Sequence, residues 1–542
     1  MSDVPRQPFT TAKFAQSGGG IDFLGLRWVS LTIVGAYLVP ELNNVTHDMG
    51  LFCLGTWIPW KFRQLCRRPT DYTESNYRSF QQKTEVAISM TFRPESNLRR
   101  ANGNVIRQIG STQTVSEPQK LTFRAAKRGD QNSLFAAANY GPAIRALQLI
   151  ADSRSPTTTP GKFLRIPIPA EDEGTNKIAS IVDETLRQSK NYDSLASLSE
   201  PPEVTWRDIH DLGECGLDPA TYRGSAFEEL KREFRMKLLP TSQDTLAYRR
   251  TLSARLLVAT LRQRPNATKE EIRDAWYRGY FLNQTSIRLD ESLANQHRCW
   301  SCLLARQHQR FPLEVFLWSF ERALKDGARG IDETVNYWRQ RSPNFEKVLA
   351  VPFRKFIRQT TGKLSGNDAL TVSRTWNREV NFQDERFEHV PEANDDDAPH
   401  HALRMIASWY LRARIRIADP SNAEFLKLGG ADRISMEWFM KWLDARLDCP
   451  TSQLVRDMFS ELIFAQHIRV ALARFDGQSQ RLRFALSDSG IEPTVSARND
   501  LAKARLPWMP DRLDSLIDLL CDCDVLTESD GKLTVGRKAD AI

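Results

Sequence analysis

The feature that most constrains the fold is a helical spacing of large apolar residues in the middle of the chain. They recur at intervals of three and four: Leu313, Phe316, Leu317, Phe320 and Leu324. This spacing places side chains on one face of an α-helix. Pro312 precedes the pattern and Gly327 follows it, as expected for the first residue and the end of a helix. The pattern predicts a helix from Pro312 to Gly327, buried along one face.

Other stretches also read as helices, so we expect a mainly α fold with small β-ribbons. The expected helices cover residues 77–90, 227–236, a segment beginning near Ser292, 401–417 and 452–473. A hairpin around Asp476-Gly477 is expected to lead into a strand at 481–484.

Two stretches combine a helix with a β-ribbon, the order of elements in a winged helix. The first is an expected helix from Asn132 to Ala151, followed by a loop and a strand at 163–168. The second is an expected helix from Pro510 to Cys521, followed by strands at 525–527 and 532–535 that Asp530-Gly531 would join. We therefore expect winged-helix-like units near the N-terminal third and at the C-terminus, the latter at about 495–538.

The length of 542 residues predicts several domains. Stretches rich in Ser, Thr and Pro, and the acidic run Asp395-Asp396-Asp397, mark the expected boundaries. The expected divisions are a flexible tail at 1–20, a basic domain at 21–168, a linker-rich segment at 169–205, a central helical domain at 206–391, an acidic linker at 392–400 and a C-terminal domain at 401–542.

Positive charge is concentrated in one segment. Between Lys61 and Asp130 there are 14 basic and six acidic residues, an excess equal to the formal net charge of +8 for the whole chain. Clustered Lys and Arg displace counterions from a phosphate backbone, which favours a nucleic-acid partner; a solvated basic surface without a ligand is the alternative. The predicted nucleic-acid-binding residues are Arg63, Arg67, Arg68, Arg99, Arg100, Arg107, Arg124, Lys127 and Arg128.

The expected C-terminal helix has the opposite charge. Asp514, Asp518 and Asp522 stand four residues apart on one face, and Asp511 lies nearby. Since phosphate repels this face, the helix is not expected to read a DNA groove. These four aspartates are predicted to contact a protein partner, with simple scaffolding as the alternative.

Motifs for chemistry are sparse. The sequence has no phosphate-binding loop, dinucleotide fingerprint or nucleophile elbow, so we expect no cofactor and name no catalytic residue. Cys299 and Cys302 lack a second ligand pair for zinc and are predicted to be buried structural thiols. The sequence Glu229-Leu230-Lys231 resembles a nuclease motif but is expected on a helix. His400-His401 beside the acidic run could collect a divalent ion, and the preferred interpretation is a solvated cluster.

The compartment is predicted to be cytoplasmic. Eight scattered cysteines are too few for a disulfide framework in a chain of this length, and the first twenty residues lack the features of a secretory signal. The longest uncharged run in the N-terminal region is residues 28–40. It is shorter than a bilayer-spanning helix, so no membrane partner is expected.

Four stretches together resemble a protein family. They are Phe23 to Leu26 through Asn43 to Thr46; Ala138 to Gly141 with Leu147 and Leu149; Trp300 through Gln307 to Glu314; and Gln466 to Ala471 followed by Leu482 to Phe484. They resemble large bacterial proteins associated with mobile elements and anti-phage defence loci, such as accessory subunits of Druantia-like systems. The resemblance implies a defence context and carries no catalytic motif.

The charge distribution and the resemblance favour a non-enzymatic, bacterial nucleic-acid-binding subunit of a defence or DNA-processing complex. Its expected partners are the backbone of DNA or RNA and other subunits, such as a helicase or nuclease. Two alternatives are a metal-dependent nuclease with an unrecognised site and a protein scaffold that does not contact nucleic acid.

Overall fold

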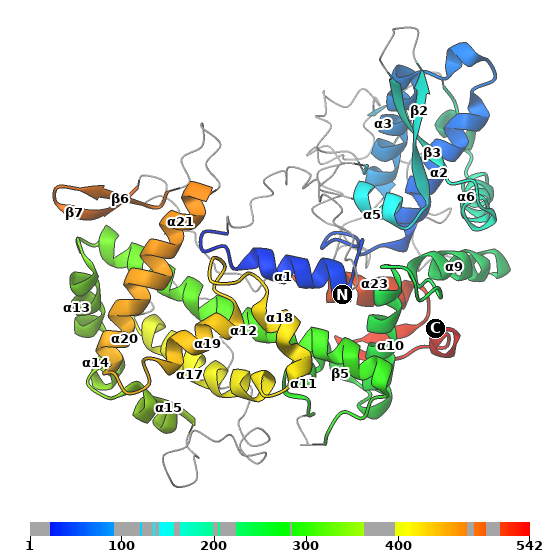
Figure 1. Ribbon diagram of the computed structural model, residues 1–542. Helices are drawn as coiled ribbons and strands as arrows, with labels where there is room; N and C mark the ends of the chain where they lie inside the picture. Colours follow the sequence, from blue (N-terminus) through cyan, green and yellow to red (C-terminus); the bar gives the residue numbers. More distant parts are fainter. Residues whose placement is uncertain are drawn as a thin grey trace. The chain divides into compact units, whose positions relative to one another are not determined.

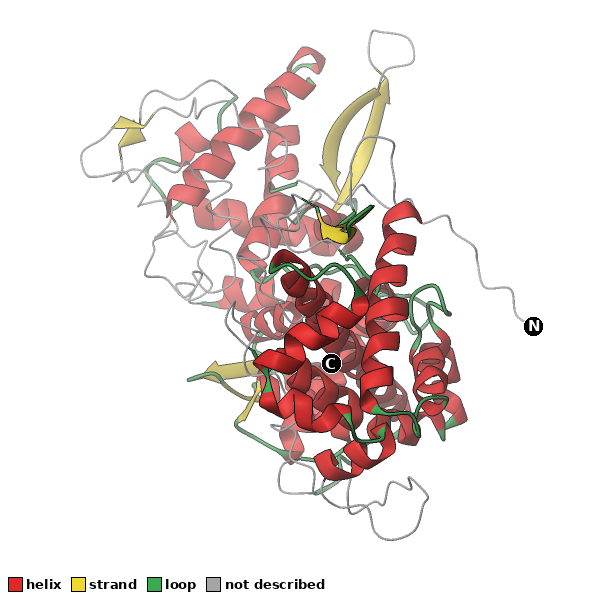
Figure 2. Ribbon diagram, turned by 90° about the vertical axis from the view of Figure 1, so that its left-hand side faces the viewer, coloured by secondary structure: helices red, strands yellow, loops and turns green. Residues whose placement is uncertain are grey.

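We describe the chain in a computed structural model. The described residues are 22–91, 120–121, 134–135, 140–156, 163–198, 204–205, 224–281, 285–361, 396–473, 482–494 and 510–542. These residues are mainly helical, with short antiparallel strand pairs (Figure 2). The predicted mainly α class with small β-ribbons is therefore confirmed. Among the described helices, none has both the length and the apolar character that crossing a bilayer requires.

Each of two compact units combines stretches that are distant in sequence. Unit 1 contains Val39–Asn266 and Arg512–Ile542, and unit 2 contains Gly20–Leu38 and Ala267–Asp511. The expected domains, by contrast, were continuous along the chain. The difference arises because short terminal stretches complete distant cores: Leu24 and Leu26 are fully buried in unit 2, and Leu516 and Leu520 are fully buried in unit 1.

Helix α2 is the apolar centre of unit 1. It packs against α6 and strand β3, as Figure 1 shows. Asp48 caps its first turn by accepting hydrogen bonds from the backbone N–H groups of Gly50 and Leu51. The helices of this unit are α2 (Met49–Leu65), η2 (Pro69–Asp71), α3 (Glu74–Thr91), α5 (Gly141–Ala146), α6 (Glu173–Leu186), α7 (Tyr192–Leu195), α9 (Ser225–Leu238), α10 (Tyr248–Gln263), α23 (Leu513–Asp522) and η7 (Ala539–Ala541).

The segment 169–205, expected to be rich in linker, contains part of the core of unit 1. Helix α6 lies within it and buries Ile178, Val182 and Leu186, which recur at intervals of four. The linker interpretation was based on the Pro- and Ser-rich composition near the ends of this segment. The structure is determined instead by the helical spacing of the apolar residues between them.

The first β-ribbon of unit 1 corrects the expected helix from Asn132 to Ala151. Its strands are β2 (Ile150–Pro156) and β3 (Phe163–Pro169), and α5 before them is only Gly141–Ala146. Gln148 adopts a positive φ of 55° and ends the helical stretch. Gly141 is required at the start, because a Cβ there would lie 2.0 Å from the Phe135 carbonyl oxygen. The expected strand at 163–168 is confirmed.

The C-terminal ribbon agrees with its prediction. Strand β8 (Leu526–Ser529) pairs with β9 (Lys532–Val535) after α23. Asp530 and Gly531 join them, with φ values of 52° and 74°. Positive φ at both positions is the requirement of the two-residue hairpin turn that Asp-Gly favours. A third pair in unit 1 joins β1 (Lys120–Leu121) to β4 (Val204–Thr205).

Helix α12 is the centre of unit 2, and it corrects the expected start at Pro312. It runs without interruption from Glu291 to Lys325, with Pro312 inside it. Asp290 caps the start by accepting a hydrogen bond from the Leu293 N–H at 2.8 Å. Proline inside a helix removes one backbone hydrogen bond. Here burial of α12 on several faces, against α11 (Lys269–Arg278) and α17 (Ala398–Ile417) among others, compensates for that loss.

The expected helix at 452–473 is confirmed as a continuous stretch with a π-helical middle, made of α20 (Thr451–Asp457), η6 (Met458–Ala465) and α21 (Gln466–Ala473). The expected strand at 481–484 is displaced: β6 (Phe484–Ser487) pairs with the following β7 (Gly490–Pro493). The expected hairpin at Asp476-Gly477 lies outside the described residues. The remaining elements of unit 2 are α1 (Arg27–Ile33), η1 (Val34–Leu38), β5 (Ala267–Thr268), α13 (Ile331–Arg341), α14 (Pro343–Leu349), α15 (Phe353–Thr361), η5 (Pro420–Asn422), α18 (Ala423–Lys427) and α19 (Met436–Asp444).

Candidate functional site

Three predicted nucleic-acid-binding arginines lie at the C-terminal end of α2, in unit 1. Arg63 is in the last turn of the helix, and Arg67 and Arg68 follow it; all three are exposed. We call these three residues the basic turn. Arg63 has a distant carboxylate partner, Glu171 Oε1 at 3.7 Å. Within the described part of the chain, no carboxylate lies within 4.0 Å of the Arg67 or Arg68 guanidinium.

The backbone of the basic turn is held in place. The N–H of Arg68 donates to Asp71 Oδ2 at 3.0 Å, and the N–H of Asp71 donates to the Arg68 carbonyl oxygen at 3.0 Å. Phe62 packs against the rings of Tyr72 and Tyr77, with ring centroids 5.6 and 5.2 Å apart. These contacts fix the end of α2 against the start of α3, so little chain entropy would be lost when the turn binds a ligand.

Two lysines counted in the basic segment have internal roles instead. Lys61 is buried, and its Nζ lies 3.1 Å from Asp183 Oδ1. Lys83 is 5% exposed and donates to the Ser194 carbonyl oxygen at 3.1 Å; burial lowers its pKa to about 8. The charge excess at 61–130 therefore overstates the charge that this segment presents to solvent.

The other six predicted nucleic-acid-binding residues, Arg99, Arg100, Arg107, Arg124, Lys127 and Arg128, lie outside the described residues. Their role stays a prediction.

The aspartates of α23 make contacts within unit 1. Asp518 Oδ2 lies 2.7 Å from His47 Nδ1, and Asp522 Oδ2 accepts a hydrogen bond from the Met49 N–H at 2.9 Å. Both carboxylates therefore lie at the start of α2, where the unsatisfied N–H groups and the helix dipole favour negative charge.

The other two acidic residues differ in exposure. Asp511, in unit 2, is 2% exposed and binds the Arg273 guanidinium through two hydrogen bonds of 2.8 Å. Asp514 is the exposed member of the α23 stripe. The intramolecular contacts give three of the four aspartates a structural role that the sequence did not predict, and partner binding by the group stays a prediction.

Two other helices rich in arginine, α10 and α17, bury some of these side chains. In α10, Arg250 is 1% exposed and donates to the Pro40 and Leu238 carbonyl oxygens at 2.9 Å each. In α17, Arg412 is 1% exposed, and Arg416 donates to Ser301 Oγ at 3.0 Å. These side chains join elements within their units and are not available to a phosphate backbone.

The thiols and the nuclease-like motif also have structural roles. Cys299 and Cys302 are buried inside α12, as predicted, and burial raises the pKa of Cys302 to about 11. The predicted helical setting of Glu229 and Lys231 is confirmed by α9. Lys231 Nζ binds Asp524 Oδ2 at 2.9 Å, within unit 1.

Unit 2 contains buried charges along α12. Glu314 accepts from Arg310 at 2.6 Å and from Arg27 at 3.1 Å, and Glu321 binds Arg483. Burial would raise the pKa of Glu314, but the two guanidinium groups outweigh it and hold that pKa below its usual value. Since both carboxylates are paired with buried guanidinium groups, they are suited to fixing the core rather than to transferring protons.

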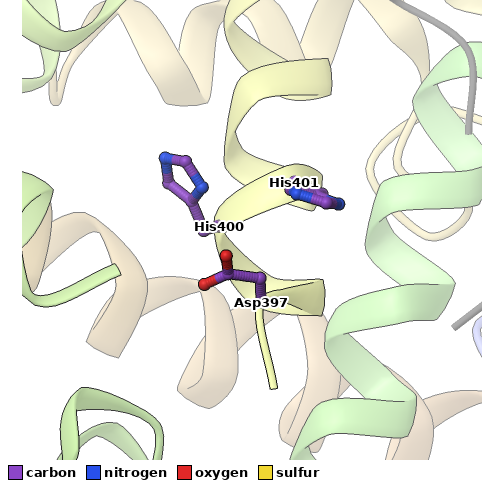
Figure 3. A group of neighbouring side chains, drawn as sticks. All are labelled: Asp397, His400 and His401. Atoms are coloured by element: carbon purple, nitrogen blue, oxygen red, sulfur yellow. The ribbon is translucent and has the colours of Figure 1, made fainter. Parts of the chain in front are cut away.

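The first turn of α17 in unit 2 brings together three potential metal ligands, Asp397, His400 and His401 (Figure 3). One donor atom from each lies within 4.8 Å of the others. Asp397 accepts hydrogen bonds from Ser342 Oγ and from Asn344 Nδ2, the latter at 2.8 Å. The sequence analysis considered a divalent ion beside these histidines and preferred a solvated cluster; the structure brings the three donor groups close together. The sequence signal for this grouping is the spacing of three and four residues from Asp397, across the helix start at Ala398.

Comparisons with protein-family models, with curated proteins and with solved structures gave no match to this chain.

Proposed function

We propose that the chain is a non-enzymatic nucleic-acid-binding subunit whose unit 1 contacts the phosphate backbone of DNA or RNA. The observation that carries the proposal is the pair Arg67 and Arg68, exposed on an ordered turn without a carboxylate partner among the described residues. The context we propose is a bacterial anti-phage defence or DNA-processing complex, in which other subunits supply the chemistry.

The basic turn suits a phosphate backbone because its charge is not neutralised locally. Guanidinium groups already paired with carboxylates would have to exchange one ion pair for another, with little gain. Arg67 and Arg68 instead would exchange water and counterions for phosphate oxygens, and the released counterions would favour binding. A guanidinium can also donate two parallel hydrogen bonds to one phosphate.

The C-terminal hairpin offers a second, smaller contact. Lys532 and Lys538 are exposed on or beside β9, whereas Arg537 lies 3.1 Å from Asp524. The winged-helix interpretation of α23 and this hairpin belongs to the proposal. In this arrangement the hairpin, and not the acidic helix, would touch phosphate.

The test is fluorescence anisotropy with labelled duplex DNA and single-stranded RNA at low salt. We expect the double variant Arg67→Glu and Arg68→Glu to bind about tenfold or more weakly than the wild type. The matched control reverses two exposed cations elsewhere, Arg264→Glu and Lys347→Glu, and should bind like the wild type. Equal binding by both double variants would contradict the role of the basic turn.

A second variant tests the rest of the predicted surface. It carries Arg99, Arg100, Arg124, Lys127 and Arg128 changed to Glu, and weaker binding is again expected. Absence of salt-sensitive binding by the wild type would favour the scaffold alternative. Divalent-ion-dependent cleavage of DNA by the purified chain would contradict the non-enzymatic assignment.

A further inference from the structure

The start of α17 combines nitrogen and oxygen donors that suit a borderline divalent metal. Asp397 precedes the helix, and His400 and His401 are three and four residues later. On a helix these offsets place both imidazoles over the turn that carries the carboxylate. Figure 3 shows the three side chains gathered there.

The carboxylate has the supporting contacts that metal ligands usually have. Ser342 and Asn344, at the start of α14, each donate a hydrogen bond to a different oxygen of Asp397. A carboxylate oxygen can accept more than one interaction, and neighbours of this kind orient ligands in known sites.

His400 supplies an independent observation. Its Nδ1 is shielded from solvent and has no hydrogen-bond partner among the described residues. A buried polar atom without a partner carries a free-energy cost, which a bound ion would remove. His400 is partly buried, so this atom lies away from bulk water.

We propose that Asp397, His400 and His401 bind one divalent transition-metal ion of the Zn²⁺ class. Two imidazoles and one carboxylate are ligands that Zn²⁺ and Co²⁺ accept, and three protein ligands leave a coordination position for water or another molecule. Donor separations of up to 4.8 Å exceed the roughly 3.3 Å between donors of a tetrahedral site with bonds of about 2.0 Å. Binding would therefore draw the donor atoms closer together, and His401 is the exposed member of the three.

The positive charge of Arg404 opposes the binding of a cation at this site. Its removal therefore tests the proposal through an expected increase in metal affinity. Arg404, one turn along α17 from His400, is exposed and acts electrostatically on that ring. Neutralising it should strengthen metal binding, because like charges repel. A purely structural cluster would not respond in this way.

The experiment is titration of the full, untagged chain with Co²⁺ followed by visible absorption, and with Zn²⁺ followed by calorimetry. We expect one saturable equivalent in the wild type and its loss in His401→Ala, an exposed position whose replacement leaves the core intact. Asn344→Ala should bind about 10- to 100-fold more weakly, and Arg404→Ala more tightly. Glu346→Gln, in the same helix as Asn344, should bind like the wild type.

Circular dichroism and thermal unfolding in EDTA verify that each variant is folded. Binding of unchanged affinity in His401→Ala and in His400→Ala would overturn the proposal. So would a wild type that takes up no more metal than the His401→Ala variant.

Discussion

The Asp522 carboxylate at the end of α23 accepts a hydrogen bond from the backbone N–H of Met49 at the start of α2, at 2.9 Å and across 473 positions of sequence. The contact satisfies one of the N–H groups that a helix start leaves free. It explains why an acidic face near the C-terminus is compatible with a folded unit: part of its charge stabilises the positive end of another helix.

Replacing Asp522 with Ala should lower the free energy of unfolding of unit 1 by about 1 kcal/mol, the usual cost of losing a helix cap. Urea denaturation measures this difference. Asp244→Ala, at an exposed position in the loop before α10, is the control and should change stability by less than about 0.5 kcal/mol. Equal stability of the two variants would show that the Asp522 contact does not cap α2.

Breaking the ion pair between Glu321 and Arg483 should be far more costly. Both side chains are 4% exposed, and Arg483 Nη2 donates to Glu321 Oε2 at 2.7 Å. Glu321→Gln leaves a buried guanidinium without its counter-charge, so we expect a loss of about 3–5 kcal/mol in denaturation experiments.

The control for this pair is Arg339→Ala, which removes an exposed ion pair with Glu346 and should cost about 1 kcal/mol or less. Replacing Glu321 and Arg483 together by Leu should recover much of the loss, since no uncompensated charge remains. A small effect of Glu321→Gln would indicate that water reaches the pair.

His467 should make unit 2 sensitive to acid. Its Nδ1–H donates to the Phe23 carbonyl oxygen at 3.1 Å, and its Nε2 accepts the Arg483 N–H at 2.9 Å. Burial lowers the pKa of His467 to about 4. Between pH 6.5 and 4 the unfolded chain therefore binds more protons, and stability falls as the pH falls, by on the order of 3 kcal/mol at pH 4.

Denaturation curves at several pH values test this dependence. His467→Gln should be less stable at pH 7 but should lose part of the slope between pH 6.5 and 4. Some slope should remain, because burial also lowers the pKa of His297 to about 4. An unchanged slope in the variant would mean that His467 is not the titrating group.

Cys299 and Cys302 should resist thiol reagents in the native protein. Both are buried in α12, and the raised pKa of Cys302 keeps it protonated at pH 8. Mass spectrometry after treatment with a thiol-specific disulfide reagent should find both modified only after denaturation. Rapid modification of Cys302 in the native protein would contradict the buried position.

The sequence was most informative where local spacing and turn chemistry determine structure. The spacing of three and four residues from Leu313 to Leu324 predicted a helix, and Asp530-Gly531 predicted a hairpin turn. Both are determined by residues close together in the sequence. It was least informative where distant residues decide the outcome. Pro312 looked like a helix start because its buried surroundings are not visible in sequence, and Lys61 looked exposed because its partner Asp183 is 122 residues away.

The candidate sites show the same contrast between features set by nearby residues and features set by distant ones. Exposure of Arg63, Arg67 and Arg68 agrees with an expectation from clustered charge. The internal partners of Asp518 and Asp522 could not be foreseen, since His47 and Met49 lie more than 450 residues away. The grouping of Asp397 with His400 and His401 was accessible from helical spacing, but its support from Ser342 and Asn344 required the fold.

The salt dependence of nucleic-acid binding tests the central claim most directly. Anisotropy titrations between about 50 and 200 mM salt give the slope of log K against log salt, which changes by about 0.9 for each phosphate contact with duplex DNA. We predict a steep negative slope for the wild type, an unchanged slope for the Arg264 and Lys347 control, and a slope shallower by about 2 when Arg67 and Arg68 are reversed. Binding that is insensitive to salt, or equal slopes in all three proteins, would contradict the binding of phosphate by the basic turn.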